Sequence, residues 1–311
     1  MSNKITTKIY CKPPITIDEQ INQLIKKGLI VSTRQNARLF LKHVSYYRLR
    51  AYTYPFQDNT TSTFHVFKRN DISLDDIIEL YNFDNKLREI LFSAISIIEV
   101  SLRTVMTQEY SEETNDSHWF TESSHYHQNY NNLIQSINSE VCRSNEEFIK
   151  HYFTKYSIPS IPPSWMTLET VSLGTLSRLL KDLKESPIKK KIATQYGLPN
   201  SKILINWIHS ISILRNHCAH HSRIWNRRFT VQIIVPRNTL FSFVSINHIQ
   251  HIKQNKIYSI IIAISYLLDV IEPNNKFVES IKELIGNRNK LVNIKEMGFP
   301  ADWLTEELWK G

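Results

Sequence analysis

A dense cluster of basic and titratable side chains lies in RNHCAHHSRIWNR, residues 215–227. Its three histidines and three arginines are His217, His220, His221, Arg215, Arg223 and Arg227. Histidine changes its charge near neutral pH, so it serves as a general acid or base and as a metal ligand. Arginine presents a planar fork of donors that fits phosphate oxygens. Metal binding, phosphoryl transfer and a basic helix end are therefore the three interpretations of the cluster.

The spacing of the cluster is helical, because residues three and four apart share one face of an α-helix. On a continuous helix, one strip would contain Asn216, His220, Arg223 and Arg227. Arg215 precedes His220 by five residues, which is about 140° around an ideal helix. The two side chains therefore meet one substrate only if the helix is distorted or if two chains contribute to the site.

Each of the three interpretations requires different residues around the histidines of the cluster. A zinc site would use the three histidines, whose i, i+3 and i, i+4 spacings suit a tetrahedral ion. However, the cluster holds no carboxylate, and its arginines would repel a cation. In phosphoryl transfer, a histidine moves a proton while an arginine stabilises the charge that develops on the phosphate. In the third interpretation, the positive charges only complement the dipole at a helix C-terminus.

The cluster lies at the end of a helix predicted over residues 201–228. Apolar residues at helical spacing predict further helices over 15–30, 73–110, 145–156, 164–183, 256–271 and 276–285. The helix over 73–110 is either one element or two joined end to end. The segment 62–70 has β character and is expected to form a short strand or hairpin arm. Three prolines between residues 159 and 163 predict a break before the helix that follows.

These elements predict an all-α fold, a helical bundle with additional N-terminal and C-terminal helices and at most a small β-hairpin. We expect an N-terminal helical and aromatic region over residues 1–70, which is a possible RNA-contacting lobe. Residues 71–311 then form the helical domain that carries the cluster. Three tryptophans are expected in the core, Trp165, Trp207 and Trp225.

Composition narrows the function further. The 38 lysines and arginines exceed the 29 acids, and the net charge of +9 is consistent with a polyanionic partner. Only six glycines occur, without a Gly-rich loop, which argues against nucleotide binding of the P-loop or dinucleotide type. The N-terminus lacks a signal-peptide core, and the most apolar run, 257–271, is too short to span a bilayer. We therefore expect a cytoplasmic protein with no membrane segment, metal or cofactor.

Two further groups of residues are candidates for the site. The first combines aromatic rings with cations in Tyr46, Tyr47, Arg48 and Arg50. Such a mixture is typical either of a surface that stacks on unpaired bases or of an aromatic core element with exposed arginines. The second is Arg103, one helical turn after Glu99. This pair either holds Arg215 or RNA beside the cluster, or is an ordinary ion pair within a helix.

The cluster resembles the motif of a known family. It fits RNxxAHHxRxxN, the motif of the Abi-like (abortive infection) proteins of bacterial phage defence, through Asn226. These proteins are similar to the HEPN superfamily of helical ribonucleases, whose signature here is Arg215, Asn216 and His220. The resemblance covers nearly the whole chain, through residues 12–31, 45–56, 162–180 and 298–309. Ala51 and Thr53 stand where the family is expected to have Gly and Trp, so no function is carried onto them.

The resemblance implies a HEPN-like bundle and a metal-independent endoribonuclease that uses the RNA 2′-hydroxyl. His220 would be the general base or acid, Arg215 the phosphate stabiliser and Asn216 an orienting residue. Further RNA contacts would come from His217, His221, Arg223, Arg227, Arg103 and the Tyr46–Arg50 group. Because two HEPN units pair and this chain has one convincing motif, the resemblance implies a homodimer, with a small structured RNA as a further partner. The alternative is a non-catalytic protein that holds a structured RNA.

Overall fold

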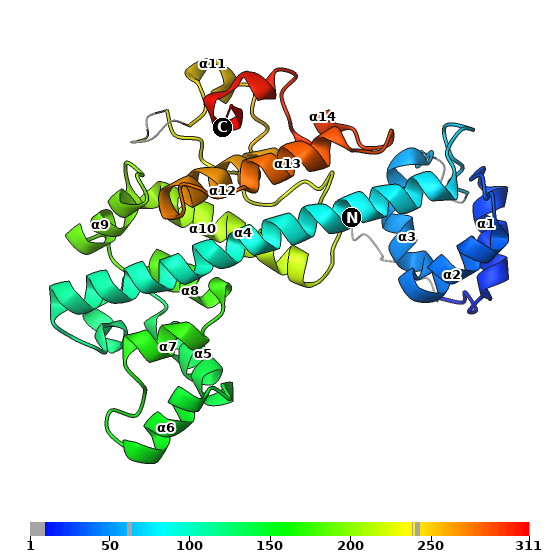
Figure 1. The fold of residues 1–311 in the computed structure, drawn as a ribbon. Coiled ribbons are helices and arrows are strands. Elements are labelled where there is room, and N and C mark those ends of the chain that lie inside the picture. The colour runs from blue at the N-terminus through cyan, green and yellow to red at the C-terminus, as the bar shows by residue number, and fades with distance from the viewer. Residues whose placement is uncertain (1–9, 61–63, 238, 240–242, 311) are drawn as a thin grey trace, which may run out of the picture. The chain divides into compact units, whose positions relative to one another are not determined.

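The computed structural model describes residues 10–60, 64–237, 239 and 243–310, and these residues form helices joined by loops (Figure 1). The described residues contain no β-strand, so the all-α fold class is confirmed. The strand expected over 62–70 is wrong in its described part, 64–70. There, Phe67 forms an isolated antiparallel bridge with Gln57. Two backbone hydrogen bonds, of 2.8 and 2.9 Å, join the segments at this bridge, and the pairing does not continue into a strand. Residues 62 and 63 lie outside the described residues.

The chain divides into two compact units. Unit 1 comprises residues 1–83 with 289–292, and unit 2 comprises residues 84–288 with 293–311. The division falls within the long helix α4 (Leu74–Thr114), which begins in unit 1 and continues through unit 2. The single helix settles the choice left open over 73–110. The domain boundary near residue 70 stays a prediction.

Unit 1 is a small helical assembly. Its helices before α4 are α1 (Ile17–Lys26), α2 (Arg34–Val44), α3 (Tyr46–Thr53) and the 3₁₀ turn η1 (Tyr54–Phe56). A capping box begins α1, in which Thr16 Oγ1 accepts from the Glu19 backbone and the Glu19 carboxylate accepts from the Thr16 backbone. Ser73 begins α4 in the same way, since its Oγ accepts from the Asp76 N–H at 3.1 Å. The apolar faces of these helices bury Ile21 and leave the charged faces in solvent.

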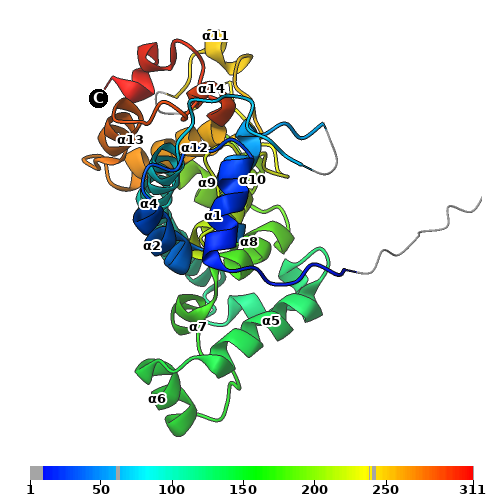
Figure 2. The ribbon, with the colours of Figure 1, turned by 90° about the vertical axis from the view of Figure 1, so that its right-hand side faces the viewer.

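Unit 2 contains the remaining elements. They are α5 (Tyr130–Arg143), α6 (Glu147–Lys155), α7 (Ser164–Thr170), α8 (Leu173–Asp182), α9 (Pro187–Gln195), α10 (Ser201–Ala219), α11 (Ile246–Ile249), α12 (Ile257–Ile271), α13 (Phe277–Gly286) and α14 (Ile294–Met297). Its 3₁₀ turns are η2 (Trp119–Thr121), η3 (Ser123–His125), η4 (Trp303–Thr305) and η5 (Glu307–Trp309). Helix α10 packs against α8, α9 and α12, and both ribbon views place it inside the unit (Figures 1 and 2).

The helix predicted over 164–183 is in fact two helices, α7 and α8. The break lies at Val171 and Ser172, because tertiary groups bond the backbone there. The Glu140 carboxylate accepts from the Ser172 N–H at 2.5 Å, and the Ser172 side chain caps α8 by accepting from the Thr175 N–H. The helix expected over 145–156 is confirmed as α6. Helices α5 and α9 were not predicted.

Helix α4 is long and apolar enough to cross a membrane, judged by length and composition. The buried core helix of a soluble protein passes the same test. Within unit 2, α4 buries Leu91, Ile98 and Leu102 together with the charged Glu99, which is the pattern of a packed core helix. The run 257–271 forms α12, which is buried along most of its length, as predicted.

Gly298 occupies a backbone conformation that other residues rarely adopt. Its φ is +94°, and a Cβ at this position would lie 2.6 Å from the Cβ of buried Lys256. We expect Gly298→Ala to lower the free energy of unfolding by about 2 kcal/mol. Gly286→Ala is the matched control, because its Cβ would meet no atom within 4 Å. Urea denaturation compares the two variants, and equal midpoints would contradict the prediction.

Candidate functional site

Helix α10 carries the first part of the cluster. Asn200 caps it, because its side chain accepts from the Ile203 N–H at 3.1 Å. Leu214 and Cys218 continue the buried face of α10 to its last turn. The opposite face is in solvent there, so it can meet a large ligand.

The helix ends within the cluster, at Ala219, so the prediction of a helix reaching residue 228 is wrong in its last part. His220 is the C-cap, and His221 has a left-handed φ of 52°. The N–H groups of the two residues after His220 donate to the carbonyls of Cys218 and His217, at 3.0 and 2.9 Å. This is a Schellman motif with histidine where glycine is usual, and histidine is among the residues that tolerate this φ.

A buried ion pair on α4 accounts for the end of α10. The Asp84 carboxylate accepts from the backbone N–H groups of Ile224 and Trp225, at 3.2 and 2.8 Å. Arg88 lies 2.5 Å from Asp84 and donates to the Ser222 carbonyl at 3.1 Å. These bonds satisfy backbone groups that would otherwise continue the helix. We call this pair and the backbone it holds the Asp84–Arg88 clasp.

Of the strip of four residues predicted on one helix face, only the first two therefore lie on α10 or at its cap. Asn216 and His220 lie one turn apart, and both are exposed. Arg223 and Arg227 lie beyond the helix, are half-buried, and are joined by a bond of 2.8 Å from Arg227 Nε to the Arg223 carbonyl. The chain direction changes at His221, so helical spacing no longer relates these arginines to the histidine.

Arg215 faces the carboxylate of α4. Its Nε lies 3.9 Å from Glu99 Oε2, which is too long for a hydrogen bond, and this Nε has no hydrogen-bond partner. Glu99 Oε1 instead lies 2.5 Å from Arg103 Nη2, which also donates to the Val171 carbonyl at 2.9 Å. The Glu99–Arg103 pair is therefore an ion pair within the helix, and its Glu99 also lies beside Arg215; a contact with RNA stays a prediction. The Arg215 side chain remains 31% exposed and keeps donors for a ligand.

The histidine nearest the protein interior is His217. It is half-buried, with its ring edge toward Phe229 at a centroid distance of 6.0 Å. Burial lowers the pKa of His217, and the nearby Arg227 and His220 lower it further. The neutral ring is therefore favoured, and a contact with RNA would be a hydrogen bond rather than a charge pair.

The lowered pKa of His217 predicts a pH-dependent stability. Because the folded pKa lies below the unfolded value of about 6.5, the unfolded chain binds more protons as pH falls through that window. The stability that the neutral His217 contributes is complete above this value and is lost as pH falls through the folded pKa. We expect the melting temperature of His217→Gln to fall less than that of the wild type between about pH 7.5 and pH 5.5. An NMR titration midpoint of His217 above the unfolded value would contradict this.

Two other chemistries find no support in the cluster. Burial raises the pKa of the Cys218 thiol to about 12, so this cysteine is not a thiolate near neutral pH. Over the described ranges, no three His, Cys, Asp or Glu side chains are grouped so that they can hold a metal ion. The three histidines of the cluster therefore do not form the tetrahedral set that zinc requires.

The aromatic and basic candidates of α3 lie in unit 1. Tyr47 is 86% exposed, whereas Tyr52 is buried and packs edge-on against Tyr81 at 5.3 Å. The half-buried residues are Tyr46, Arg48 and Arg50. Tyr46 accepts a hydrogen bond from Lys27 Nζ at 3.4 Å. The helix thus has an aromatic core face and also presents one tyrosine to solvent.

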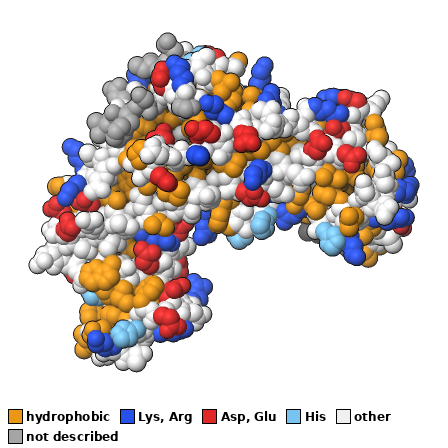
Figure 3. Space-filling model, viewed as in Figure 1, with side chains coloured by type: hydrophobic (Ala, Val, Ile, Leu, Met, Phe, Trp, Pro, Cys, Tyr) orange, Lys and Arg blue, Asp and Glu red, His pale blue; other side chains and the backbone are white. Residues whose placement is uncertain are grey.

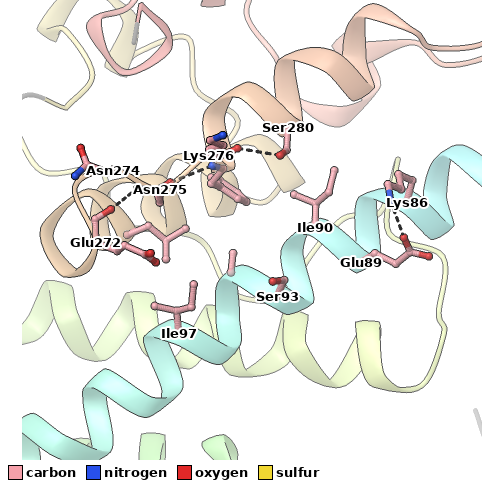
Figure 4. A pocket seen from close by; sticks show the side chains of 13 residues that line it. Lys86, Glu89, Ile90, Ser93, Ile97, Glu272, Asn274, Asn275, Lys276 and Ser280 are labelled. Carbon is pink, nitrogen blue, oxygen red and sulfur yellow. Dashed lines mark hydrogen bonds and ion pairs between the residues drawn. The ribbon is translucent and has the colours of Figure 1, made fainter.

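A cavity of about 450 Å³ in unit 2 lies between α4 and the turn from α12 to α13 (Figure 4). None of the cluster residues lines it. Its polar side chains bond locally, as Lys86 does with Glu89 at 3.1 Å and Ser280 with the Lys276 carbonyl at 2.9 Å (Figure 4). These groups do not converge on a common point, so the cavity adds no chemistry to the cluster.

A family model described as Abi-like protein matches residues 39–226, which is more than half of the chain. The match includes α4, α10 and the cluster as far as Asn226. The chain belongs to the Abi-like family. The matched range is shorter than the resemblance predicted, since residues 12–31 and 298–309 lie outside it. Comparison with curated proteins and with solved structures gives no significant match.

The Asp84–Arg88 clasp of this Abi-like protein was missed by sequence reasoning. The available signal was a pair of opposite charges four residues apart between the apolar residues Phe83, Leu87 and Leu91. Such a pair on a buried face needs partners, because an unpaired buried charge is costly. Their partners are backbone groups about 140 residues later in the chain, and no local pattern indicates them.

Proposed function

We propose that this Abi-like protein is a cytoplasmic phage-defence effector and a metal-independent endoribonuclease of the HEPN type. The observation that carries the proposal is the last turn of α10, where Asn216 and His220 are exposed and Arg215, on another side of the helix, is half-buried. An exposed histidine is accessible to a macromolecular substrate. The Arg215 side chain is 31% exposed, so its guanidinium group can donate to phosphate oxygens.

The reaction needs no group beyond the protein, the RNA and water. His220 takes the proton of the 2′-hydroxyl or gives one to the leaving 5′-oxygen, and the other proton is exchanged with water. The 2′-oxygen then bonds to phosphorus while the bond from phosphorus to the 5′-oxygen breaks, which leaves a 2′,3′-cyclic phosphate and a 5′-hydroxyl. Arg215 stabilises the charge on the phosphate, and Asn216 orients it. Secondary RNA contacts are assigned to His217, His221, Arg223 and Arg227.

A homodimer is part of the proposal. Arg215 points toward α4 while His220 faces solvent about 140° away around the helix, so one chain does not surround a phosphate. A second copy related by a two-fold axis supplies the missing side. Uncharged exposed residues follow one face of α4 next to Glu99, namely Phe92, Ser96 and Val100. This face is the surface that we assign to the pairing.

The second candidate function is a non-catalytic protein that holds a small structured RNA. The net charge of +9 favours it, since affinity for a polyanion comes largely from such charge. The two functions are compatible, because a bound RNA can restrain a nuclease.

The test is purification from a bacterial host without nuclease treatment, in EDTA, for wild type and for an Arg215→Ala, His220→Ala double variant. Sequencing of bound RNA and detection of new cyclic-phosphate ends follow. New ends with wild type alone support the ribonuclease, and equal ends with both proteins exclude it. One discrete RNA bound by both proteins without new ends favours the second function.

A further inference from the structure

Hydrophobic side chains gather on the surface of unit 2 over α6, α7 and the loop between them (Figure 3). The exposed residues here are Phe148, Phe153, Tyr156, Ile158 and Trp165, and we call them the aromatic tip. Trp165 is 53% exposed, so the prediction that it lies in the core is wrong, whereas Trp207 and Trp225 are buried as predicted. The start of α7 is itself covered, since Ser164 is fully buried, and Trp165 lies on the exposed side of the helix.

The aromatic tip is held by buried neighbours. Tyr152 is buried, donates its hydroxyl to the Pro159 carbonyl at 2.8 Å, and packs against the rings of Phe153 and Tyr156, at 5.7 and 5.3 Å. Under α7, Thr167 Oγ1 donates to the Pro162 carbonyl at 2.7 Å. These buried contacts fix the segments that carry the exposed rings, so little conformational entropy is lost when a flat ligand covers the rings.

Cations interleave with the rings of the tip. Lys150 and Lys155 are exposed on α6, and Lys155 Nζ lies 5.3 Å from the centroid of the Tyr156 ring. The acidic Glu147 begins the same helix and pairs with Lys150, whose Nζ lies 3.5 Å from Glu147 Oε1, with both side chains more than half exposed. Protein–protein interfaces are depleted in lysine, whereas alternating rings and cations are typical of surfaces that bind single-stranded nucleic acid. The composition of the tip therefore favours a nucleic acid over a protein partner.

Helix α7 connects the tip to the candidate site. Trp165 lies at its start, and Val171 follows its end, so the two residues are about 9 Å apart along the axis. The Val171 carbonyl accepts from Arg103, and Arg103 pairs with Glu99, the residue that faces Arg215. A strand of RNA at Arg215 would therefore have the aromatic tip within reach.

We propose that the aromatic tip binds unpaired nucleotides of the RNA, with Trp165 and Tyr156 stacking on bases and Lys150 and Lys155 contacting phosphates. The proposal rests on the proposed RNA partner, but it does not require cleavage. Neither of these aromatic residues belongs to the catalytic cluster.

The test is fluorescence anisotropy at low salt with a fluorescein-labelled oligouridylate of about twelve nucleotides. All proteins carry His220→Ala, so that the probe stays intact. We expect Trp165→Leu to weaken binding about tenfold, because a stacking face is lost, and Trp165→Phe to stay near the parent. Leu304→Ala is the control, because Leu304 is 54% exposed but distant in sequence from the tip.

The outcomes separate this proposal from the proposed function. Equal affinity for Trp165→Leu and the parent overturns the aromatic tip, whatever the cleavage assays show. A mass change on light scattering in Trp165→Leu, with unchanged RNA affinity, also overturns it and makes the tip a contact between copies. A loss confined to Trp165→Leu supports the tip even if wild type never cleaves RNA. Cross-links from 4-thiouridine to the peptide that contains Tyr156 or Trp165 give an independent confirmation.

Discussion

Replacing His220 by alanine is expected to lower the rate of RNA cleavage at least about a hundredfold, the usual loss when a general acid or base is removed. The side chain is exposed at the C-cap of α10, so its removal leaves the helix and its buried face intact. The expected signature is a lower maximal rate with nearly unchanged RNA affinity. Single-turnover cleavage of a labelled RNA in EDTA measures both quantities.

Arg215→Ala is expected to lower the rate of RNA cleavage by a similar factor, about a hundredfold to a thousandfold, because charge stabilisation in the transition state is lost. Arg215→Lys should not restore the rate, since a point charge lacks the planar fork that spans two phosphate oxygens. The Glu99 carboxylate would still attract the lysine, so the charge is retained and only its geometry changes.

His209→Ala is the matched control for both variants. His209 lies on the same helix and is exposed, but it is outside the cluster. Its replacement should leave the cleavage rate at the wild-type value. If His209→Ala and His220→Ala slow cleavage equally, the effect belongs to α10 as a whole and the catalytic assignment is wrong.

Much of the fold follows from local patterns. The capping box at Thr16 and the cap at Ser73 are encoded within a few residues, and the helices that they begin were predicted. The breaks at Val171 and after Ala219 were not predicted. At each of them a side chain from a different helix, Glu140 or Asp84, binds the backbone, and helical periodicity carries no information about such partners.

Like the fold, the candidate site was predictable from the sequence only where local patterns determine it. The density of histidine and arginine identifies the cluster, and the i, i+4 spacing identifies Glu99 and Arg103. Which residues share a surface depends on where α10 ends, and that depends on the clasp. Trp165 shows the same limit, because its residue type favours the core while the tertiary structure leaves it on the exposed side of α7.

The Asp84–Arg88 clasp makes the largest prediction for stability. Asp84→Ala is expected to lower the free energy of unfolding by about 3–5 kcal/mol, because it removes the carboxylate that pairs with the buried Arg88 charge. Asp84 is fully buried, so water does not replace the carboxylate. The backbone N–H groups of Ile224 and Trp225 lose their acceptor as well. Urea denaturation measures the change.

Asp84→Asn separates the two contributions, since the amide oxygen still accepts from the backbone but the charge is gone. Its loss of stability should lie between zero and that of Asp84→Ala. A double variant, Asp84→Ala with Arg88→Met, should be more stable than Asp84→Ala alone, because no buried charge then remains. If the double variant is instead the least stable protein, the two side chains contribute independently and the clasp is not a coupled pair.

Because the clasp holds the backbone that follows His221, Asp84→Asn should also slow RNA cleavage without removing any residue of the cluster. The stability of the fold is in this way connected to the geometry of the site.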